Sequence, residues 1–501
     1  MRHRVTFFHR NEHGIDPSSL KISGRSVSGP DLIAVREHRV TLALEELPAE
    51  LQELLRETRE LHIRWSKPRV YDTLGPWSSR LPPGLHAFYT PQTTSAVDSQ
   101  RVCEQLRAAL GDIDCSSPAE SFTKLPTDRF SHSTEFQYFQ PVNTLVHLSK
   151  YAEQYGCAFD DTVCHKWTRE LGNAVSLDLS YDSVARSLKI TALWPEEHQK
   201  LSVHSHPDHR TEVGILTPDS PPHLERHELG VTGLLTVLGE DTKPSPVLFA
   251  FPSRHKTSDS TYSSTFLRPW GLHPTLQLSI DSNKSPLPSD STCSLYVYLT
   301  LPRTIFVDKY QLGDDLFLSS KNLTALRYIS QPVDLEAPDY AMKLWGSSVL
   351  LELQPPGAQG DLPWTAEIPL HLRYLAPAEG GYESIDIPWP AVFWACNAEE
   401  KIEFPNSPFD RANLGYDGLF DPQTLFWHIS PKSEGHGSLN HRIQVPVLDS
   451  NRIEWISAGT TIVVLIGFAY IIFKLASVYW RTGYGGQQQL TTTAESEKKE
   501  Q

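Results

Sequence analysis

Hydrophobic residues in the first part of this chain recur at helical spacing. Four leucines follow this pattern on one predicted helix, with Pro48 placed for its first turn: Leu47, Leu51, Leu54 and Leu55. A second short helix is predicted over Val102–Leu110, ending at Gly111, and a third over Leu145–Tyr155. We therefore expect residues 1–180 to form a mixed α+β region.

From about residue 181 the period changes to two, which is typical of β-strands. Apolar residues alternate with polar ones in several runs, for example across residues 188–194, and again from Leu295 to Leu301. Clusters of Pro, Gly, Ser and Asp separate these runs. This pattern predicts a mainly β chain, with an antiparallel sandwich-like domain over residues 181–428 and a juxtamembrane stalk over 429–455.

The stretch Ile456–Phe473 carries no charged residue and consists mostly of large apolar side chains. At about 1.5 Å per residue, such a helix spans roughly 27 Å, close to the thickness of an endoplasmic reticulum bilayer. We expect one transmembrane helix over residues 456–480. Lys474 and Arg481 follow the apolar stretch, whereas Asp449, Arg452 and Glu454, which sum to a negative charge, precede it. Because positive residues stay cytosolic, we expect a cytosolic tail over 481–501 and a lumenal N-terminal part.

Short signals near the two ends bear on the location. Lys498 and Lys499 match the dilysine retrieval signal of endoplasmic reticulum membrane proteins, so a single-pass protein of that membrane is expected. The first ten residues carry positive charge but no apolar run, which argues against a cleavable signal peptide. The reverse orientation, a cytosolic domain held by a tail anchor, therefore stays open.

Composition narrows the class of protein. A hydrophobic content of 39% is typical of folded chains, and a formal net charge of −15 argues against nucleic acid as a partner. The six cysteines allow three disulfides in fifteen connectivities, which fits an oxidising lumen. Asn283 and Asn322 each begin an N-x-S/T sequon, so both are candidate glycosylation sites of a glycoprotein.

One string resembles an enzyme motif. The ligand types of the H-x-H-x-D-H zinc motif of metallo-β-lactamase-type hydrolases occur here in order: His204, His206, Asp208 and His209. That family also has a Gly-rich turn directly after the motif, whereas Arg210 and Thr211 follow here. With 21 histidines in the chain, a polar loop explains the string equally simply. A zinc-dependent hydrolase therefore stays a distant alternative, and no metal, cofactor or catalytic residue is expected.

The C-terminal half resembles the PIG-X family, whose fungal members are the protease-B-nonderepressible proteins. Four strings carry this resemblance: PLHLRY at 369–374, IPWPAVFWAC at 387–396, LPRTIFVDKY at 301–310 and VDLEAP at 333–338. The resemblance extends over roughly residues 210–475, including the single span. Residues 1–200 resemble the extension of the fungal branch.

This resemblance implies a function without catalysis by the chain itself. The family suggests an accessory subunit of the endoplasmic reticulum mannosyltransferase I, which adds the first mannose to the glycosylphosphatidylinositol (GPI) anchor precursor. Its expected partner is the multi-span catalytic subunit, which it stabilises. A general, chaperone-like role in folding lumenal proteins is the second interpretation.

Several residues are candidates for contact with this partner. In the family-like strings these are His371, Arg373, Tyr374, Trp389 and Trp394. Each of them could equally be a core residue, with His371 and Arg373 pairing with carboxylates such as Asp308 or Glu336. In the span, Gly459 and Gly467 lie on one helix face, where glycines allow close approach of another helix.

Overall fold

A computed structural model describes residues 1–10, 14–93, 99–126, 135–157, 161–220, 223–225, 227–281, 286, 293–330, 334–355, 363–397, 404, 414–432 and 437–483. The protein is mainly β, as expected, with a single long C-terminal helix among the described residues. The chain divides into a larger unit, Met1–Leu375 with Ser384–Ile443, and a smaller one, Ala376–Glu383 with Gln444–Gln501.

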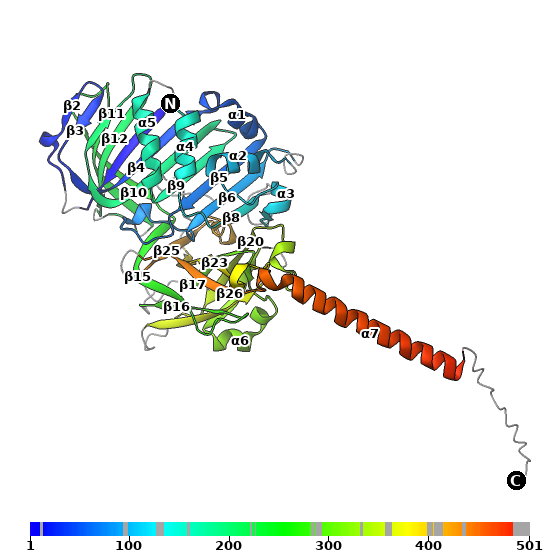
Figure 1. The fold of residues 1–501 in the computed structure, drawn as a ribbon. Coiled ribbons are helices and arrows are strands. Elements are labelled where there is room, and N and C mark those ends of the chain that lie inside the picture. The colour runs from blue at the N-terminus through cyan, green and yellow to red at the C-terminus, as the bar shows by residue number, and fades with distance from the viewer. Residues whose placement is uncertain are drawn as a thin grey trace, which may run out of the picture. The chain divides into compact units, whose positions relative to one another are not determined.

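The first half of the larger unit is built on an eleven-stranded sheet (Figure 1). Its strands, in spatial order, are β14 (Ser245–Pro252), β13 (Glu228–Val237), β12 (Arg210–Asp219), β1 (Arg2–Phe8), β4 (Leu32–Ala43), β10 (Ser187–Gln199), β9 (Ser176–Asp182), β5 (Thr58–Ser66), β6 (Gly84–Pro91), β8 (Phe136–Gln140) and β7 (Thr123–Lys124). Neighbours are antiparallel except β1 and β12, which run parallel. A small sheet of β11 (Ser202–His204), β3 (Ser26–Ser28) and β2 (Lys21–Ser23) shares a hydrophobic cluster with this sheet.

Helices cover one face of the first sheet (Figure 1). These are α1 (Ala49–Arg56), α2 (Arg101–Leu110), the short α3 (Pro118–Ser121), α4 (Val146–Tyr155) and α5 (Thr162–Glu170). The three predicted helices are confirmed as α1, α2 and α4, except that α1 begins at Ala49, so that Leu47 and Pro48 precede it. In α2, Val102, Leu106 and Leu110 are buried on the face toward the sheet, and Gly111 ends the helix with a φ of +90°.

The second half of the larger unit is built on an eight-stranded sheet. Its spatial order is β19 (Leu323–Ile329), β20 (Gly346–Leu353), β17 (Cys293–Pro302), β24 (Ala391–Asn397), β25 (Thr424–Pro431), β15 (His255–Phe266), β16 (Thr275–Ile280) and β21 (Trp364–Pro369). Only β15 and β25 are parallel neighbours. Smaller elements are β18 (Ile305–Phe306) paired with β22 (His371–Leu372), helix α6 (Asp315–Ser320), and strands β23 (Tyr382–Pro388) and β26 (Asn440–Pro446).

Aromatic side chains join the two sheets. Phe88 of the first sheet packs with Tyr298 and Phe393 of the second in one buried cluster. Gln137 Nε2 donates to the Tyr298 hydroxyl at 3.0 Å, and Ser348 Oγ donates to Gln137 Oε1 at 3.2 Å. Because this cluster covers the second face of β17, Tyr298 is buried as fully as Leu299, and the expected alternation disappears.

The predicted domain boundaries can be located on the strands of the structure. Residue 180 lies within β9, and the chain passes from the first sheet to the second between β14 and β15. The predicted stalk, 429–455, contains the end of β25, all of β26 and the first residues of α7. The division into domains itself stays a prediction.

Helix α7 (Ile453–Thr482) contains the predicted span. It is the one helix among the described residues that is long and apolar enough to cross a membrane, and its most apolar 18-residue window has a mean hydropathy of 2.2. None of its apolar window is buried within the protein. The chain therefore has the composition of a single-pass membrane protein.

All six cysteines are paired. The disulfides are Cys103–Cys115, Cys157–Cys164 and Cys293–Cys396. The last pair joins directly opposite residues of the neighbouring strands β17 and β24. The two others close short loops beside α2 and α5.

Candidate functional site

The string at 369–374 contributes β22, which brings distant family-like strings together. Leu370 and Leu372 are buried, and Arg373 is only 4% exposed. Arg373 donates to the backbone oxygens of Asp334 and Ala337 and lies 4.4 Å from the ring centre of Phe306. This arginine therefore fixes the loop that follows residue 333, and its hydrogen bonds go to main-chain oxygens.

His371 is half-buried beside the same loop. Its Nε2 lies 3.1 Å from Gln311 Oε1, and its Nδ1 lies 2.9 Å from His273 Nδ1. Burial lowers the pKa of His371, and the neighbouring His273 lowers it further. Its contacts position Gln311, and with it the segment that begins at Tyr310.

Three tyrosines project into solvent around β18 and β22. Tyr310, Tyr340 and Tyr374 are 70%, 68% and 69% exposed. The segments that carry them are linked, because the N–H of Asp339 donates to the Tyr374 oxygen at 2.9 Å and Gln311 contacts His371. We call Tyr310, Tyr340 and Tyr374 the tyrosine surface. Tyrosines with an apolar ring and a polar tip are common at protein interfaces.

Sequence reasoning named only Tyr374 among these three. Tyr310 ends the family-like string at 301–310, and Tyr340 lies just beyond the string at 333–338. Their positions in or beside those strings were the available signal. Their exposure, which separates them from the other aromatic residues of the strings, depends on the fold.

The two predicted tryptophan contacts lie inside the protein. Trp389 and Trp394 are 6% and 4% exposed. The Trp389 ring stacks on His441 with ring centres 5.5 Å apart, and Trp394 stands opposite Leu295 of β17. Both have the setting of core aromatics, which was the alternative interpretation of their strings.

The glycines of α7 leave one helix face shallow. A Cβ added at Gly459 or Gly467 would meet no atom within 4 Å. They are eight residues apart, a rotation of about 80° around the axis, so both lie within one half of the helix circumference. This arrangement leaves room for a neighbouring helix to approach closely.

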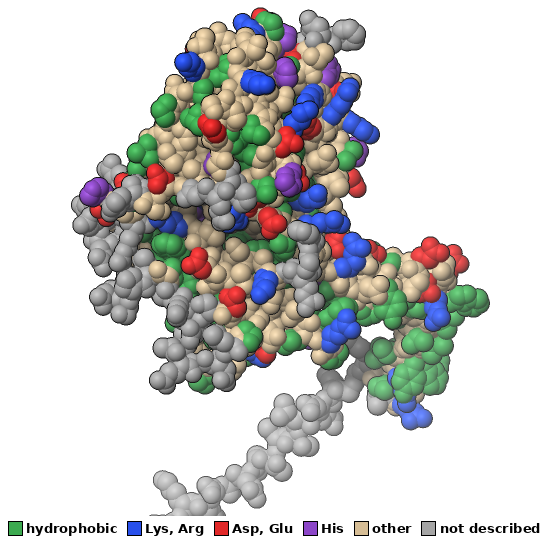
Figure 2. Space-filling model, turned by 90° about the vertical axis from the view of Figure 1, so that its left-hand side faces the viewer, with side chains coloured by type: hydrophobic (Ala, Val, Ile, Leu, Met, Phe, Trp, Pro, Cys, Tyr) green, Lys and Arg blue, Asp and Glu red, His purple; other side chains and the backbone are tan. Residues whose placement is uncertain are grey.

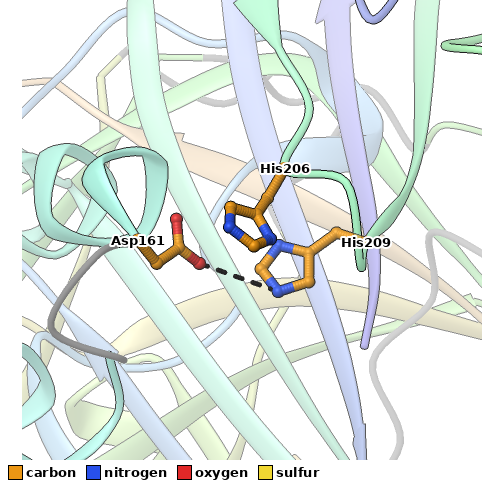
Figure 3. A group of neighbouring side chains, drawn as sticks. All are labelled: Asp161, His206 and His209. Carbon is orange, nitrogen blue, oxygen red and sulfur yellow. Dashed lines mark ion pairs between the residues drawn. The ribbon is translucent and has the colours of Figure 1, made fainter.

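The histidine string does not form the four-ligand zinc cluster of the distant alternative. His204 is the exposed last residue of β11, where it pairs with Ser26, and the Asp208 side chain is 86% exposed. Instead, His206 and His209 turn toward Asp161, which begins α5 (Figure 3). His204 and Asp208 therefore lie outside this group of possible ligands, because β11 ends at His204, before the turn that carries the two histidines.

Asp161 is the member of this group that sequence reasoning missed. It is 4% exposed, and its Oδ1 accepts hydrogen bonds from the N–H groups of Val163 and Cys164. Burial lowers the pKa of His209, while the nearby Asp161 carboxylate opposes that change. An Asp before an apolar helix indicates an N-cap, but only the fold brings it to the histidines.

Buried histidines also occur beside this group and elsewhere in the protein. Burial lowers the pKa of His3, His86 and His441 to about 4, so these three, which we call the buried histidines, are neutral at pH 7. The Nε2 of His3 lies 3.0 Å from Nδ1 of His38. A neutral imidazole with such partners is typical of a structural role.

An apolar cavity of about 170 Å³ lies between the helices and the first sheet. Its lining includes Leu51, Leu106 and Ile190. A second cavity of about 110 Å³ shares Ile190 and extends to His3 and His209. The larger cavity is lined mainly by leucines, so it does not have the convergent polar groups of a typical catalytic pocket.

The remaining predicted sites are the two glycosylation sequons and the dilysine retrieval signal. Asn322 is half-buried, and its Nδ2 donates to the Thr365 oxygen at 2.7 Å. Asn283, Lys498 and Lys499 lie outside the described residues. Glycosylation and retrieval stay predictions.

The net charge of −15 is not gathered on the face drawn in Figure 2. Acidic and basic side chains are interspersed there, with hydrophobic ones between them. Such a face lacks the single-sign field that attracts a highly charged partner.

Comparison with known proteins gives consistent results over the whole chain. The family model described as PIG-X / PBN1 matches residues 269–476. The protein pbn1 of Neurospora crassa is 51% identical, with 100% of both chains covered. PBN1 of Gibberella zeae is 47% identical over 95% of this chain and 96% of its own, and pbn1 of Emericella nidulans is 40% identical over 98% of each.

Proposed function

Because this chain belongs to the PIG-X / PBN1 family, we propose that it is the non-catalytic stabilising subunit of GPI mannosyltransferase I. Family membership supports a role related to GPI-anchor biosynthesis. The observation that carries the proposal is the 51% identity to a PBN1 protein across the entire chain. In this role the protein binds the multi-span catalytic subunit, which transfers the first mannose to the GPI precursor.

We also propose that the β-rich part faces the lumen of the endoplasmic reticulum. Three disulfides favour an oxidising compartment, and Lys474 and Arg481 favour a cytosolic end after the span. The dilysine signal at 498–499 would then be available to cytosolic retrieval machinery. Endoglycosidase treatment tests the orientation: a shift that is lost in Asn322→Gln supports it, whereas a full-length protein without glycan contradicts a glycosylated lumenal part.

The tyrosine surface is the proposed lumenal contact with the catalytic subunit. It combines three exposed rings with the strings that carry the family resemblance, and Arg373 and His371 hold its segments in place. Exposed aromatic residues that lie close together commonly anchor interfaces. Arg373 and His371 act here as positioning residues.

Co-purification tests the subunit role and this surface separately. The full-length protein is solubilised in detergent, captured, and its partners are identified by mass spectrometry. We expect a multi-span mannosyltransferase in stoichiometric amounts, and at least a tenfold lower recovery with Tyr310→Ala/Tyr340→Ala/Tyr374→Ala. Tyr155→Ala, at an exposed tyrosine of α4, is the matched control. Equal recovery with the triple variant rejects the surface, and no mannosyltransferase with the unaltered protein rejects the subunit role.

The glycine face of α7 is the proposed contact within the membrane. Leucines at Gly459 and Gly467 would fill the space that a partner helix needs, so Gly459→Leu/Gly467→Leu should lower partner recovery. Thr461→Leu adds bulk on the side of the helix that faces away from both glycines and should have little effect. Unchanged recovery with the double glycine variant would leave α7 as an anchor only.

One observation favours the second candidate, a general lumenal chaperone. Strand β14 forms an edge of the first sheet, contains no charged residue, and exposes Leu248 and Phe249. An exposed apolar edge can pair with extended segments of other chains. In this role, Leu248→Lys/Phe249→Lys should lower the amounts of several unrelated lumenal proteins, while the mannosyltransferase partner still co-purifies. Loss of GPI-anchored proteins alone after depletion of the protein would argue against it.

A further inference from the structure

Three possible metal ligands from two distant segments meet beside the first sheet (Figure 3). Asp161 comes from the start of α5, and His206 and His209 come from the turn between β11 and β12. One ligand atom of each residue lies within 4.8 Å of those of the other two. We propose that Asp161, His206 and His209 form a zinc-binding site.

The carboxylate is oriented before any metal binds. Two backbone N–H groups hold Asp161 Oδ1, at 3.1 Å and 2.9 Å, which leaves Oδ2 facing His209. The distance from Oδ2 to His209 Nε2 is 3.7 Å, too long for a hydrogen bond. Ligand atoms around a tetrahedral zinc with bonds of about 2.1 Å lie about 3.4 Å apart. The separation of these two atoms is therefore close to that of two ligands of one zinc ion.

The turn that carries the histidines is also held in place. The N–H of Ser205 donates to the Arg25 oxygen at 2.9 Å, and Arg25 Nη1 donates to the Pro207 oxygen at 2.8 Å. The N–H of His209 donates to the His206 oxygen at 3.1 Å, which closes the turn and brings both rings to one side. Their ring centres are 4.9 Å apart. The ligand atoms of the group lie within 4.8 Å of one another, so His206 would move inward to reach the separation of about 3.4 Å around zinc.

The donor set and its surroundings fit zinc. Two imidazoles and one carboxylate are ligands that zinc accepts, and three protein ligands leave a fourth position for water. Asp208 Oδ2 lies 3.8 Å from His206 Nδ1, beyond hydrogen-bond distance, so Asp208 does not fix the ring of His206. The nearby N-terminal ammonium is paired with Glu46 at 2.6 Å, which limits its repulsion of a cation.

Zinc at this position would connect two otherwise separate parts of the fold. Cys157–Cys164 closes the loop that presents Asp161, and the histidines lie on the connection into β12. A bound ion would therefore tie this disulfide-closed loop to the first sheet. The site is independent of the proposed subunit role.

Zinc titration of the variants tests the site. Metal-free full-length protein in detergent, purified through a tag without histidine, is titrated with zinc chloride against a competing chelator. We expect one zinc per chain, and binding at least about 100-fold weaker in Asp161→Asn and in His209→Gln. Asn caps helices as well as Asp does, so Asp161→Asn removes the charge but keeps the helix start. His204→Gln, in the same string but outside the group, should bind zinc like the unaltered protein.

Thermal melting gives an independent measurement. Zinc should raise the melting temperature of the unaltered protein and of His204→Gln, but not that of Asp161→Asn or His206→Gln. Either of two results would overturn the site: no zinc bound by the unaltered protein, or equal zinc affinity in the unaltered protein, Asp161→Asn and His209→Gln. The second result would show that zinc binds at other histidines.

Discussion

Replacing Glu135 should make the protein more stable, by an amount that grows with pH. Glu135 lies directly before β8, and only 7% of it is exposed. Burial, together with the negative charges of Asp417 and Glu60, raises the pKa of its carboxyl to about 8. The folded protein therefore keeps a proton on Glu135 at pH 7, which the unfolded chain loses above its ordinary pKa of 4.5.

The sign and size of the change in the free energy of unfolding follow from this difference in pKa. Between about pH 4.5 and pH 8 the folded state binds one more proton than the unfolded state, so the free energy of unfolding decreases as the pH rises. At about 1.4 kcal/mol per pH unit, the loss is about 3 kcal/mol at pH 7 and reaches about 5 kcal/mol above pH 8. Glu135→Gln keeps the shape of the side chain and has no proton to lose, so it should escape this loss.

Thermal melting across pH measures the effect on Glu135. For a chain of this size, about 1 kcal/mol corresponds to about 1 °C in melting temperature. We expect Glu135→Gln and the unaltered protein to melt together near pH 4.5, and the variant to melt about 3 °C higher at pH 7. Glu53→Gln, at an exposed position of α1, is the control and should show no such divergence. Parallel curves for Glu135→Gln and the unaltered protein would refute a protonated, buried Glu135.

Three further predictions concern stability. The buried histidines have folded pKa values near 4, below the unfolded value of 6.5, so their contribution should be lost as the pH falls from about 6.5 to about 4, measured as a falling melting temperature. Gly346→Ala should lower the free energy of unfolding by about 2 kcal/mol or more, because φ is +147° and the new Cβ would lie 2.0 Å from a backbone oxygen. Gly313→Ala, where a new Cβ meets open space, is the control and should lower it by under about 1 kcal/mol, both measured by chemical denaturation. Replacing Cys293 and Cys396 by alanine should cost about 4–5 kcal/mol, because their disulfide closes a loop with a sequence separation of 103; an unchanged denaturation midpoint would contradict this.

Local patterns in the sequence were sufficient to predict the elements that depend on one apolar face or one apolar stretch. Helices α1 and α2 each have one apolar face that packs against the protein and one polar face toward water, and this arrangement is visible in the spacing of their residues. The apolar run of α7 likewise indicates its environment by itself. The parallel pairing of β1 with β12 and the double burial of β17 depend on segments that are far apart in the chain. Such contacts leave no periodic signal in either segment.

The same difference between local patterns and contacts of distant segments explains which parts of the candidate sites could be predicted. The string at 204–209 showed that histidines are concentrated, but the end of β11 separates His204 from the others, and Asp161 comes from another element. Arg373 was expected to pair with a carboxylate, as its charge alone suggests. It instead satisfies backbone oxygens, because the loop that crosses it presents carbonyl groups at a buried position.

The family-like strings gain a common meaning from their arrangement in the fold. β18, from the string at 301–310, pairs with β22, from the string at 369–374. The N–H of Arg373 donates to the Thr304 oxygen at 2.9 Å, while its guanidinium holds Ala337, at the end of the string at 333–338. Three separate strings thus build one small framework whose buried residues fix its shape and whose tyrosines face solvent. Buried polar contacts explain why these strings need defined residues, whereas the exposed rings at the same place are the part that we propose contacts the catalytic subunit.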